Sequence, residues 1–316
     1  MGLFPKATLP LELGLPMGPY SNVYYVDAAN GDDDNTGKSP YKPLKTLTEA
    51  EDKCTTNQHD VVAIISGASG INLTETLTWD KSYTHLVGLC APTMVGQRAR
   101  IFGHEDNDDV TPLINITGSG CVFKNLYAFN GIDDAGCLIN VQVTGDRNYF
   151  ENVHFAGGGH ASNAIDGGAS LKLDAAYECT FRGCTIGVDT VAAATGMAGV
   201  IVDTQSGRNI FEDCNFTMYA GHAGAKFVEI ADNDGFDRYL IFKNCLFIND
   251  ATGYTMTEAF TVPADMGSET HRIILHGCAF CGIGDIEDND RGIVYTTSGT
   301  FTAGGNAAIM AAVAAT

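Results

Sequence analysis

A short phrase recurs six times at intervals of about thirty residues, and this repeat constrains the fold more than any other feature of the chain. Each copy has a large apolar lead residue, a polar residue, a turn residue and then another apolar residue. The lead residues are Phe123, Phe150, Phe181, Phe211, Phe242 and Leu275, spaced by 27, 31, 30, 31 and 33 residues. Six copies in one register predict a stack of equivalent structural units.

Each repeat has the pattern of short strands joined by turns. The turn position holds Asn125, Asn152, Gly183, Asp213, Asn244 and Gly277. These residue types tolerate a left-handed backbone, and after them apolar and polar residues alternate with the period of a strand. A second apolar run precedes most copies, as in Leu113–Ile116 and Val200–Val202. We therefore expect two or three short strands in each repeat and no helix between them.

Thirty residues are too few for a βαβ unit, whose crossover helix would be visible in the sequence. A propeller blade would need four antiparallel strands and about forty residues. The repeat length instead fits one coil of a parallel β-solenoid, in which the inward side chains of each coil pack on the next coil about 4.8 Å away. The predicted fold class is therefore all-β.

Stacking places equivalent positions above one another, so that columns can be predicted from the sequence. One inward column contains Cys184, Cys214, Cys245 and Cys278. We interpret it as a stack of small buried hydrophobic residues with free thiols, as expected for synthesis in a reducing cytoplasm. The chain lacks the paired CxxC motifs of a zinc site.

Two further columns lie at the turn and just before it. Asn125, Asn152 and Asn244 are predicted to hydrogen-bond from coil to coil as an amide ladder. The outward residues after the lead positions alternate in charge: Lys124, Glu151, Arg182, Glu212 and Lys243, followed by His276. Opposite charges on neighbouring strands stabilise pairing, so we interpret this column as a ladder that fixes register. The alternative is a catalytic groove formed by Glu151, Arg182 and Glu212.

The segment 22–60 has the features of a cap on the N-terminal end of the solenoid. Val23–Val26 is predicted to be a strand, residues 31–37 a loop, and Thr46 with Glu49 a capping box that opens a short helix. A solenoid needs such a cap because its open edges would otherwise recruit other chains.

This opening also resembles that of a known group. The motif consists of Tyr25-Val-Asp27, Gly31-Asp32, Asn35-Thr-Gly37, Ser39-Pro40, Pro43, Lys45-Thr-Leu47 and Ala50. It is similar to the start of pectate-lyase-like right-handed parallel β-helix proteins, and the coils that follow agree over residues 22–300. The resemblance implies a right-handed β-helix. It does not imply one activity, because the superfamily includes polysaccharide lyases and hydrolases, phage tailspikes and trimeric proteins that decorate capsids.

The two ends of the chain differ from the repeats. Residues 1–21 contain four prolines among apolar residues, and we expect an extended N-terminal arm that lies on another surface or covers the first coil of its own chain. The candidate contact residues are Leu3, Phe4, Pro5, Leu9, Leu11, Leu13 and Leu15. We expect the cap at 22–60, the β-helix at 61–302 and a C-terminal cap or contact segment at 303–316.

The charge balance excludes several classes of partner. With 18 Lys and Arg against 38 Asp and Glu, the formal net charge is −20, which argues against binding to nucleic acid and to anionic membranes. We expect no membrane span, because no apolar stretch approaches about 20 residues. The N-terminus lacks the basic-then-apolar pattern of a secretory signal, so we expect synthesis in the host cytoplasm.

No convincing catalytic constellation emerges from the sequence. Four acidic clusters fall in different turns, and Asp32 and Asp34 partly imitate a calcium loop whose twelfth position would be Pro43. We interpret that loop as solvated and expect no cofactor, with Ca²⁺ at Asp32/Asp34 as the alternative. Asp133 and Asp134 form an adjacent carboxylate pair in an early coil, and His154 and His160 could meet across a turn.

These observations favour a phage virion structural protein over an enzyme. We expect a capsid decoration (cement) protein on the virion surface, a homotrimer by family resemblance, which binds and stabilises the assembled shell through its major capsid protein. The alternative is a polysaccharide lyase, hydrolase or tailspike acting on a carbohydrate, which rests on the fold resemblance. A surface adhesin is a third hypothesis.

Overall fold

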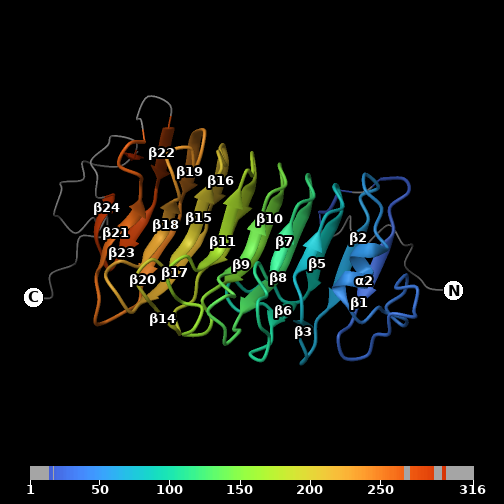
Figure 1. The fold of residues 1–316 in the computed structure, drawn as a ribbon. Helices are drawn as coiled ribbons and strands as arrows, with labels where there is room; N and C mark the ends of the chain where they lie inside the picture. The colour runs from blue at the N-terminus through green and yellow to red at the C-terminus, as the bar shows by residue number, and fades with distance from the viewer. Residues whose placement is uncertain (1–13, 17, 267–270, 288–293, 297–316) are drawn as a thin grey trace, which may run out of the picture.

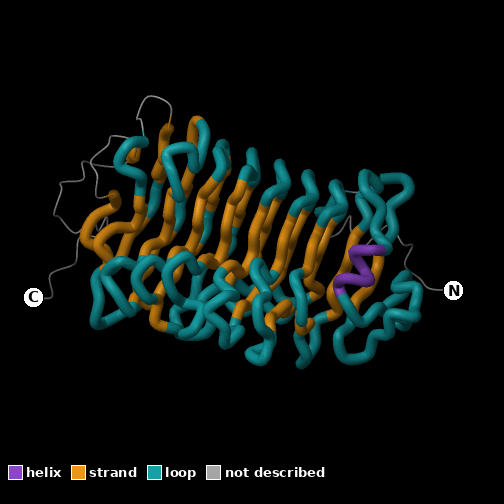
Figure 2. The backbone as a smooth tube through the Cα atoms, viewed as in Figure 1, coloured by secondary structure: helices purple, strands orange, loops and turns teal. Residues whose placement is uncertain are grey.

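The chain folds into a right-handed parallel β-helix (Figure 1). The computed structural model describes residues 14–16, 18–266, 271–287 and 294–296. Successive coils stack along one axis from the N-terminal to the C-terminal end, and the strands run side by side while loops gather along the edges (Figures 1 and 2). All strand pairs between coils are parallel, as predicted from the thirty-residue repeat.

The strands form two sheets. The larger sheet contains β1 (Val23–Val26), β2 (Val61–Ile65), β3 (Ile71–Leu73), β5 (His85–Leu89), β6 (Arg100–Gly103), β8 (Val122–Asn130), β10 (Tyr149–Ala156), β12 (Thr180–Arg182), β13 (Thr185–Ile186), β14 (Ala192–Ala193), β16 (Asn209–Glu212), β17 (Asn215–Ala220), β19 (Arg238–Lys243), β20 (Leu246–Asn249), β22 (His271–His276), β23 (Ala279–Cys281) and β25 (Val294–Thr296). The second sheet contains β4 (Leu77–Trp79), β7 (Ile114–Ile116), β9 (Ile139–Val143), β11 (Ala169–Asp174), β15 (Ala198–Asp203), β18 (Lys226–Ile230), β21 (Met256–Thr261) and β24 (Ile283–Glu287).

From β8 onward, a single left-handed residue bends each coil of the larger sheet after the lead residue. The six predicted turn residues, from Asn125 to Gly277, have φ between 52° and 66°. This confirms the interpretation of the Asn, Asp and Gly positions, since these types tolerate such a backbone. In β8 and β10 the strand continues through the turn, so that one long strand contributes to both segments of the sheet.

The lead residues stack as an aromatic column inside the solenoid. Phe150 and Phe181 lie with ring centroids 4.7 Å apart and an interplanar angle of 2°, and Phe181 and Phe211 are 4.6 Å apart at 9°. The register extends this column back through Leu86 and Val62 to Tyr24 in β1. These three members escape sequence detection because irregular loops separate them. Since β1 pairs in register with β2, the predicted cap segment supplies the first rung of the β-helix.

The cap contains the one helix of the described residues, α2 (Leu47–Asp52), which lies at the N-terminal end of the stack (Figure 2). Its N-cap is Thr46, whose hydroxyl accepts a hydrogen bond from the Glu49 amide at 3.2 Å, as predicted. The other half of the capping box differs. The Thr46 amide donates to Asp33 at 3.0 Å, while the Glu49 carboxylate pairs with Lys53.

We expect Asp33→Ala to destabilise the cap by about 1–2 kcal/mol at neutral pH, as loss of a helix cap does. Partial burial acts to raise the pKa of Asp33, but hydrogen bonds from Thr46 and Lys45 outweigh it and lower the pKa. A lowered pKa contributes stability above the ordinary value, which is lost as pH falls through the folded-state value. Urea melts from pH 7 to pH 2 should therefore show the difference shrink at acid pH. The exposed neighbour gives the control, Asp34→Ala, and an equal loss in both variants would contradict the assignment.

Candidate functional site

The four cysteines of the predicted column stack inside the solenoid as free, buried thiols. Each lies next to the backbone of the preceding coil and donates to the carbonyl of its lead phenylalanine. The Cys214 thiol lies 3.4 Å from the Phe181 carbonyl, and the Cys278 thiol lies 3.3 Å from that of Phe242. Cys184 and Cys245 make the corresponding contacts at 3.6 and 3.4 Å. The column therefore combines hydrophobic packing with weak hydrogen bonds.

We expect a thiol reagent such as Ellman's reagent to label the native protein mainly at Cys281, which is exposed. Burial raises the pKa of the Cys179 thiol to about 12, so that little reactive thiolate forms at neutral pH. Half-buried Cys90 should react more slowly than Cys281, and all ten thiols should react after unfolding. Fast labelling of three or more thiols in the folded protein would contradict this arrangement.

The turn column forms side-chain bridges at two of its steps. The Asn152 side-chain amide donates to the Asn125 side-chain oxygen at 3.0 Å, and Asn244 donates to Asp213 at 3.2 Å. Gly183 stands between these pairs and has no side chain to continue them. The Asn125–Asn152 step therefore matches the expected ladder, while Asn244 uses an aspartate as its partner.

The outward charged residues lie on directly paired positions of successive strands. The charged groups of Lys124 and Glu151 are 2.8 Å apart. The Glu212 carboxylate accepts a hydrogen bond from Lys243 at 2.5 Å and lies 3.9 Å from the Arg182 guanidinium. The Glu151 carboxylate also accepts the Tyr149 hydroxyl at 3.2 Å. The three residues of the alternative catalytic groove thus lie in one column and contact charged or hydroxyl neighbours from their own sheet.

We expect Arg182→Glu to lower the melting temperature by a few degrees. The substitution places three carboxylates on adjacent strands, where like charges oppose pairing. Differential scanning fluorimetry in low salt should show the loss, and 0.5 M NaCl should reduce it because exposed charges are screened. Arg182→Gln is the matched control, with a smaller loss. An unchanged melt for Arg182→Glu would count heavily against a register-fixing ladder.

A buried column that our sequence interpretation missed lies two residues before the lead positions. Cysteine and asparagine alternate there from Cys121 through Asn148 and Cys179 to Asn209. The Cys121 amide donates to the Asn148 side-chain oxygen at 2.8 Å, and the Cys179 amide donates to Asn209 at 2.8 Å. The signal was the alternation itself, visible once the repeats are aligned.

The loop Cys90–Ala99, between β5 and β6, also escaped prediction. At the equivalent position, each later coil has a single turn residue. Here the loop folds over the outer face of β10 and β13. Gln97 donates to the Asn152 backbone and side-chain oxygens at 3.0 and 3.1 Å, and the Thr185 hydroxyl donates to the Met94 carbonyl at 2.8 Å. These contacts fix the loop and leave the side chains of Met94 and Val95 exposed.

The loop covers His154, whose two ring nitrogens both contact the backbone. The Gly96 amide donates to its Nδ1 atom at 3.2 Å, so its Nε2 atom carries the hydrogen and donates to the Gly187 carbonyl at 2.9 Å. Burial lowers the pKa of His154, which favours the neutral ring. A histidine held in this way is a structural link between coils and has no free nitrogen for proton transfer.

His160 lies in a separate, exposed group with Asp133 and Ser162. Its Nδ1 atom is 3.1 Å from the Asp133 carboxylate, and the Ser162 hydroxyl donates to the same carboxylate at 2.5 Å. A hydrolytic triad would require the serine to contact the imidazole. Asp134 instead accepts amides from Gly136 and Asp109 at 2.9 and 2.8 Å. The group therefore has the residue types of a triad without its connectivity.

The acidic loop at residues 31–37 is organised by its own backbone. Asp32 accepts the Asp34 amide at 3.0 Å, and Asp33 turns toward the start of α2. Across the described ranges, no group of three or more His, Cys, Asp or Glu side chains is arranged to hold a metal ion. No helix in those ranges has the length and apolarity of a membrane span.

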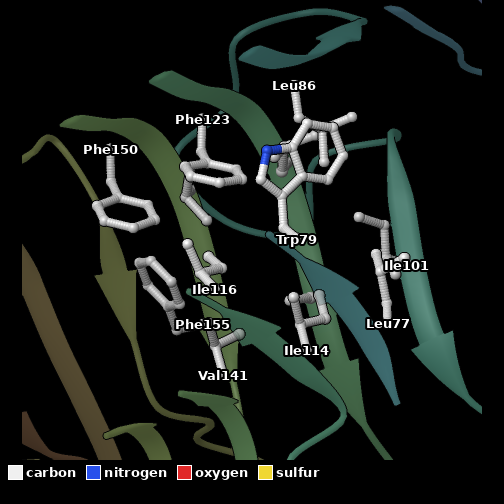
Figure 3. A pocket seen from close by; sticks show the side chains of 13 residues that line it. Leu77, Trp79, Leu86, Ile101, Ile114, Ile116, Phe123, Val141, Phe150 and Phe155 are labelled. Carbon is white, nitrogen blue, oxygen red and sulfur yellow. The ribbon is translucent and has the colours of Figure 1, made fainter. Parts of the chain in front are cut away.

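An internal cavity lies where the aromatic column gives way to smaller side chains. Leu86 occupies the lead position below Phe123, and Trp79 approaches Phe123 edge-on with ring centroids 5.7 Å apart. Figure 3 shows apolar side chains from both sheets pointing into this space. The lining residues are Leu77, Trp79, Leu86, Ile101, Ile114, Ile116, Phe123, Leu126, Ala128, Val141, Phe150, Val153 and Phe155. This is a packing void of the core, without the convergent polar groups of a ligand site.

The arm can be placed at one of its candidate residues. Leu15 is buried against Val23, Val61, Ala63 and Val87, which belong to the outer face of β1, β2 and β5. Leu15 therefore covers the first coils of its own chain, which was the second of the two expectations for the arm. Leu3, Phe4, Pro5, Leu9, Leu11 and Leu13 lie outside the described residues, as does the segment 303–316.

Comparison with protein-family models gives no match, and comparison with curated proteins gives none. Among solved structures, pectin methylesterase PemA from Erwinia chrysanthemi is similar with a TM-score of 0.55 and 15% identity, covering 91% of this chain and 92% of that chain. Pectate lyase Pel9A has a TM-score of 0.51 and 15% identity, covering 90% and 80%.

A third structure, described as Geobacillus virus E2 ORF18, has a TM-score of 0.48 and 15% identity, covering 87% of this chain and 58% of that chain. The two enzyme structures, at 15% identity, bear on the fold alone. The resemblance predicted from the opening motif is thus confirmed at that level: the chain has the right-handed parallel β-helix fold that these pectin methylesterase and pectate lyase structures share.

Proposed function

We propose that this protein is a structural component of a phage virion, a β-helical decoration protein that binds and stabilises the assembled shell. The observation that carries the proposal is that charged side chains on the outer surface are engaged with one another from coil to coil. Besides the Lys124–Glu151 and Lys243–Glu212 pairs, Glu178 is held between Arg147 at 2.7 Å and Arg208 at 2.5 Å. Such a surface supports a rigid body.

The charges of the second sheet are paired in the same way. The Lys172 amine lies 3.4 Å from the Asp174 carboxylate and 3.0 Å from that of Asp203 in the next coil. With a formal net charge of −20, a densely displayed protein of this kind would stay soluble through mutual repulsion. A stiff, acidic rod meets the mechanical needs of a shell component, whereas a hydrolase would need free, convergent acid and base groups.

In this proposal the protein attaches through the N-terminal arm, upstream of Leu15, where Leu3, Phe4 and Pro5 are consecutive apolar residues in the sequence. In this proposal the protein is a homotrimer on the virion surface, made in the host cytoplasm, and its partner is the major capsid protein. Binding to the assembled form alone would stabilise the shell by mass action. No cofactor is needed, and Ca²⁺ at the Asp32/Asp34 loop would be an accessory to the cap.

The test is the copy number of this chain relative to the major shell protein in gradient-purified particles from its source. Hundreds of copies per particle would support decoration. A few dozen or fewer would point to a tail spike, and absence from particles would overturn the virion proposal. Deleting residues 1–8, which leaves Leu15 in place, should abolish attachment while circular dichroism shows an intact β-helix. Continued attachment would remove the arm from the mechanism.

The second candidate is a protein that acts on a polysaccharide, as an enzyme or a tailspike. It is favoured by the likeness of the fold to pectin methylesterase PemA and pectate lyase Pel9A. A panel of polysaccharides that includes pectin and polygalacturonate, assayed for released methanol, new reducing ends and unsaturated products, would detect either chemistry. Turnover of any of them would move this candidate to first place.

A further inference from the structure

A histidine is fully buried on the outer face of the larger sheet. His85 in β5 lies in one row with Val61 of β2 and Val122 of β8. His59 lies against it, and the His59 ring meets Tyr83 edge-on. The ring centroids of the two histidines are 5.3 Å apart, whereas the His59 Nδ1 atom is 3.1 Å from the His85 Nε2 atom. These two nitrogens therefore lie between the rings, as in a hydrogen bond.

The backbone of β8 fixes where the hydrogens of this His59–His85 pair lie. The Val122 amide donates to the Nδ1 atom of His85 at 3.1 Å, so the hydrogen of the neutral His85 ring is on Nε2. This Nε2 atom then donates to the Nδ1 atom of His59, whose own hydrogen is on its Nε2 atom. The hydrogen bonds thus all run in one direction, from β8 through His85 to His59.

This chain of hydrogen bonds has no place for an added proton. On His85 the proton would go to Nδ1, where it would face the Val122 amide hydrogen. On His59 it would go to Nδ1 and face the hydrogen on His85, and shifting that hydrogen to Nδ1 would return the conflict to Val122. Protonation of either ring therefore breaks a hydrogen bond at a buried group. Burial, followed by the neighbouring His59, lowers the pKa of His85 to about 4.

The carboxylates on the surrounding elements are bound to other groups. The titratable neighbours of the pair, element by element, are Tyr20 before β1, Tyr25 in β1, Asp60 before β2, Tyr83 before β5, Cys121 and Lys124 at β8, and Tyr149 and Glu151 in β10. Asp60 accepts the Asn22 and Thr55 amides at 2.6 and 2.8 Å. Glu151 pairs with Lys124 at 2.8 Å. An added proton on the histidines therefore gains no carboxylate partner in the closed structure.

We propose that the His59–His85 pair is an acid-sensitive latch, which holds residues 18–22 and 55–60 against β5 and β8 while both rings are neutral and releases them when the pair takes up a proton. The two segments are joined, because the Ser21 hydroxyl donates to the Gln58 carbonyl at 2.7 Å. Displacing His59 therefore moves both of them away from the coils. The latch needs only this chain, so it is independent of the decoration role.

The test is hydrogen exchange of the full-length protein at pH 7.5 and pH 5.0, above the range in which most carboxylates titrate. Acid favours the open form, because His85 has its ordinary pKa of 6.5 there and excludes the proton when closed. The protection factors of β5 amides should therefore fall by about 30-fold between these two pH values. Those of β19 and β20, far along the stack, should change by less than about threefold.

Glutamine at both positions gives a latch that cannot titrate. The His59→Gln/His85→Gln variant keeps a hydrogen-bond donor and acceptor on each side chain, and its β5 protection should lose most of its dependence on pH. His104→Gln is the matched control, because His104 is exposed, and it should respond to acid as the wild type does. A wild-type protein whose β5 protection falls no more than that of the double variant would overturn the latch.

Two measurements on the wild type remain if the double variant fails to fold. Trp79, the one tryptophan of the chain, donates to the hydroxyl of Thr84, the residue before His85, at 2.9 Å. Its quenching by acrylamide should rise several-fold at pH 5.0. Nuclear magnetic resonance of the histidine-labelled protein at pH 7.5 should place the His85 hydrogen on Nε2. A hydrogen on Nδ1 would contradict the chain of hydrogen bonds, and equal loss of protection in all coils would show acid unfolding in place of local release.

Discussion

Phe181→Ala is expected to lower the free energy of unfolding by about 3–5 kcal/mol, the cost of removing a fully buried phenylalanine from a core. Its ring is stacked between Phe150 and Phe211 and touches the edge of Phe155, with centroids 5.9 Å apart. Urea denaturation followed by circular dichroism would measure the loss. Tyr41→Ala, at a site that is 93% exposed, should change the midpoint little.

The loss should also be local, because each coil of a solenoid packs mainly against its neighbours. Hydrogen exchange in the Phe181→Ala variant should quicken in β10, β12 and β16, while β1 and β2 keep their wild-type protection. A midpoint within the range of Tyr41→Ala would contradict the role of the aromatic column. Uniform loss of protection over all coils would show that the chain unfolds as one unit.

Gly187→Ala is expected to cost about 2–5 kcal/mol for two reasons that add. Gly187 has a φ of 104°, which L-residues avoid at a cost of about 1–2 kcal/mol. A Cβ atom there would also lie 2.0 Å from the Thr217 carbonyl oxygen of the next coil, and overpacking of this kind costs about 1–3 kcal/mol. The same substitution would disturb the hydrogen bond from His154 to the Gly187 carbonyl.

Gly183→Ala is the matched control, four residues earlier in the same coil. Gly183 has a φ of 57°, but a Cβ atom there would have no neighbour within 4 Å. Only the cost of a left-handed backbone remains, so we expect the free energy of unfolding to fall by about 1 kcal/mol. Thermal and urea melts of the two variants therefore separate the backbone preference from the collision between coils. If both variants lose the same stability, the coils must be able to move apart at Gly187 at little cost.

The stack and its turns could be predicted because they are local and repeated. The lead phenylalanines recur in one register, and each is followed two positions later by a residue that accepts a left-handed backbone. The same reasoning failed at Val62 and Leu86, where long loops break the spacing. The alternation of cysteine with asparagine, as at Cys121 and Asn148, is present in the aligned repeats. It was missed because the cysteines were interpreted only as small buried hydrophobic residues.

The remaining contacts join residues far apart in the chain. The Asp33 carboxylate reaches the start of α2 across 13 residues, and the Thr185 hydroxyl contacts Met94 across 91. No pattern in the sequence specifies which loop folds over which coil. The packing of Leu15 likewise depends on the outer residues of β1, β2 and β5, which lie in one row. This row can be recognised only after the strands are placed in register.

The loop Cys90–Ala99 shows that a coil can carry ten residues where the later coils have a single turn residue, without losing register on either side. The turn at Gly183 has the same place in its coil and faces open space. A foreign peptide inserted there would project from the side of the rod at a height set by the coil number. Peptides inserted at Gly183 and Gly277 would stand about three coils apart, or roughly 14 Å along the axis. Two epitopes could thus be presented at a separation set by the number of coils between them.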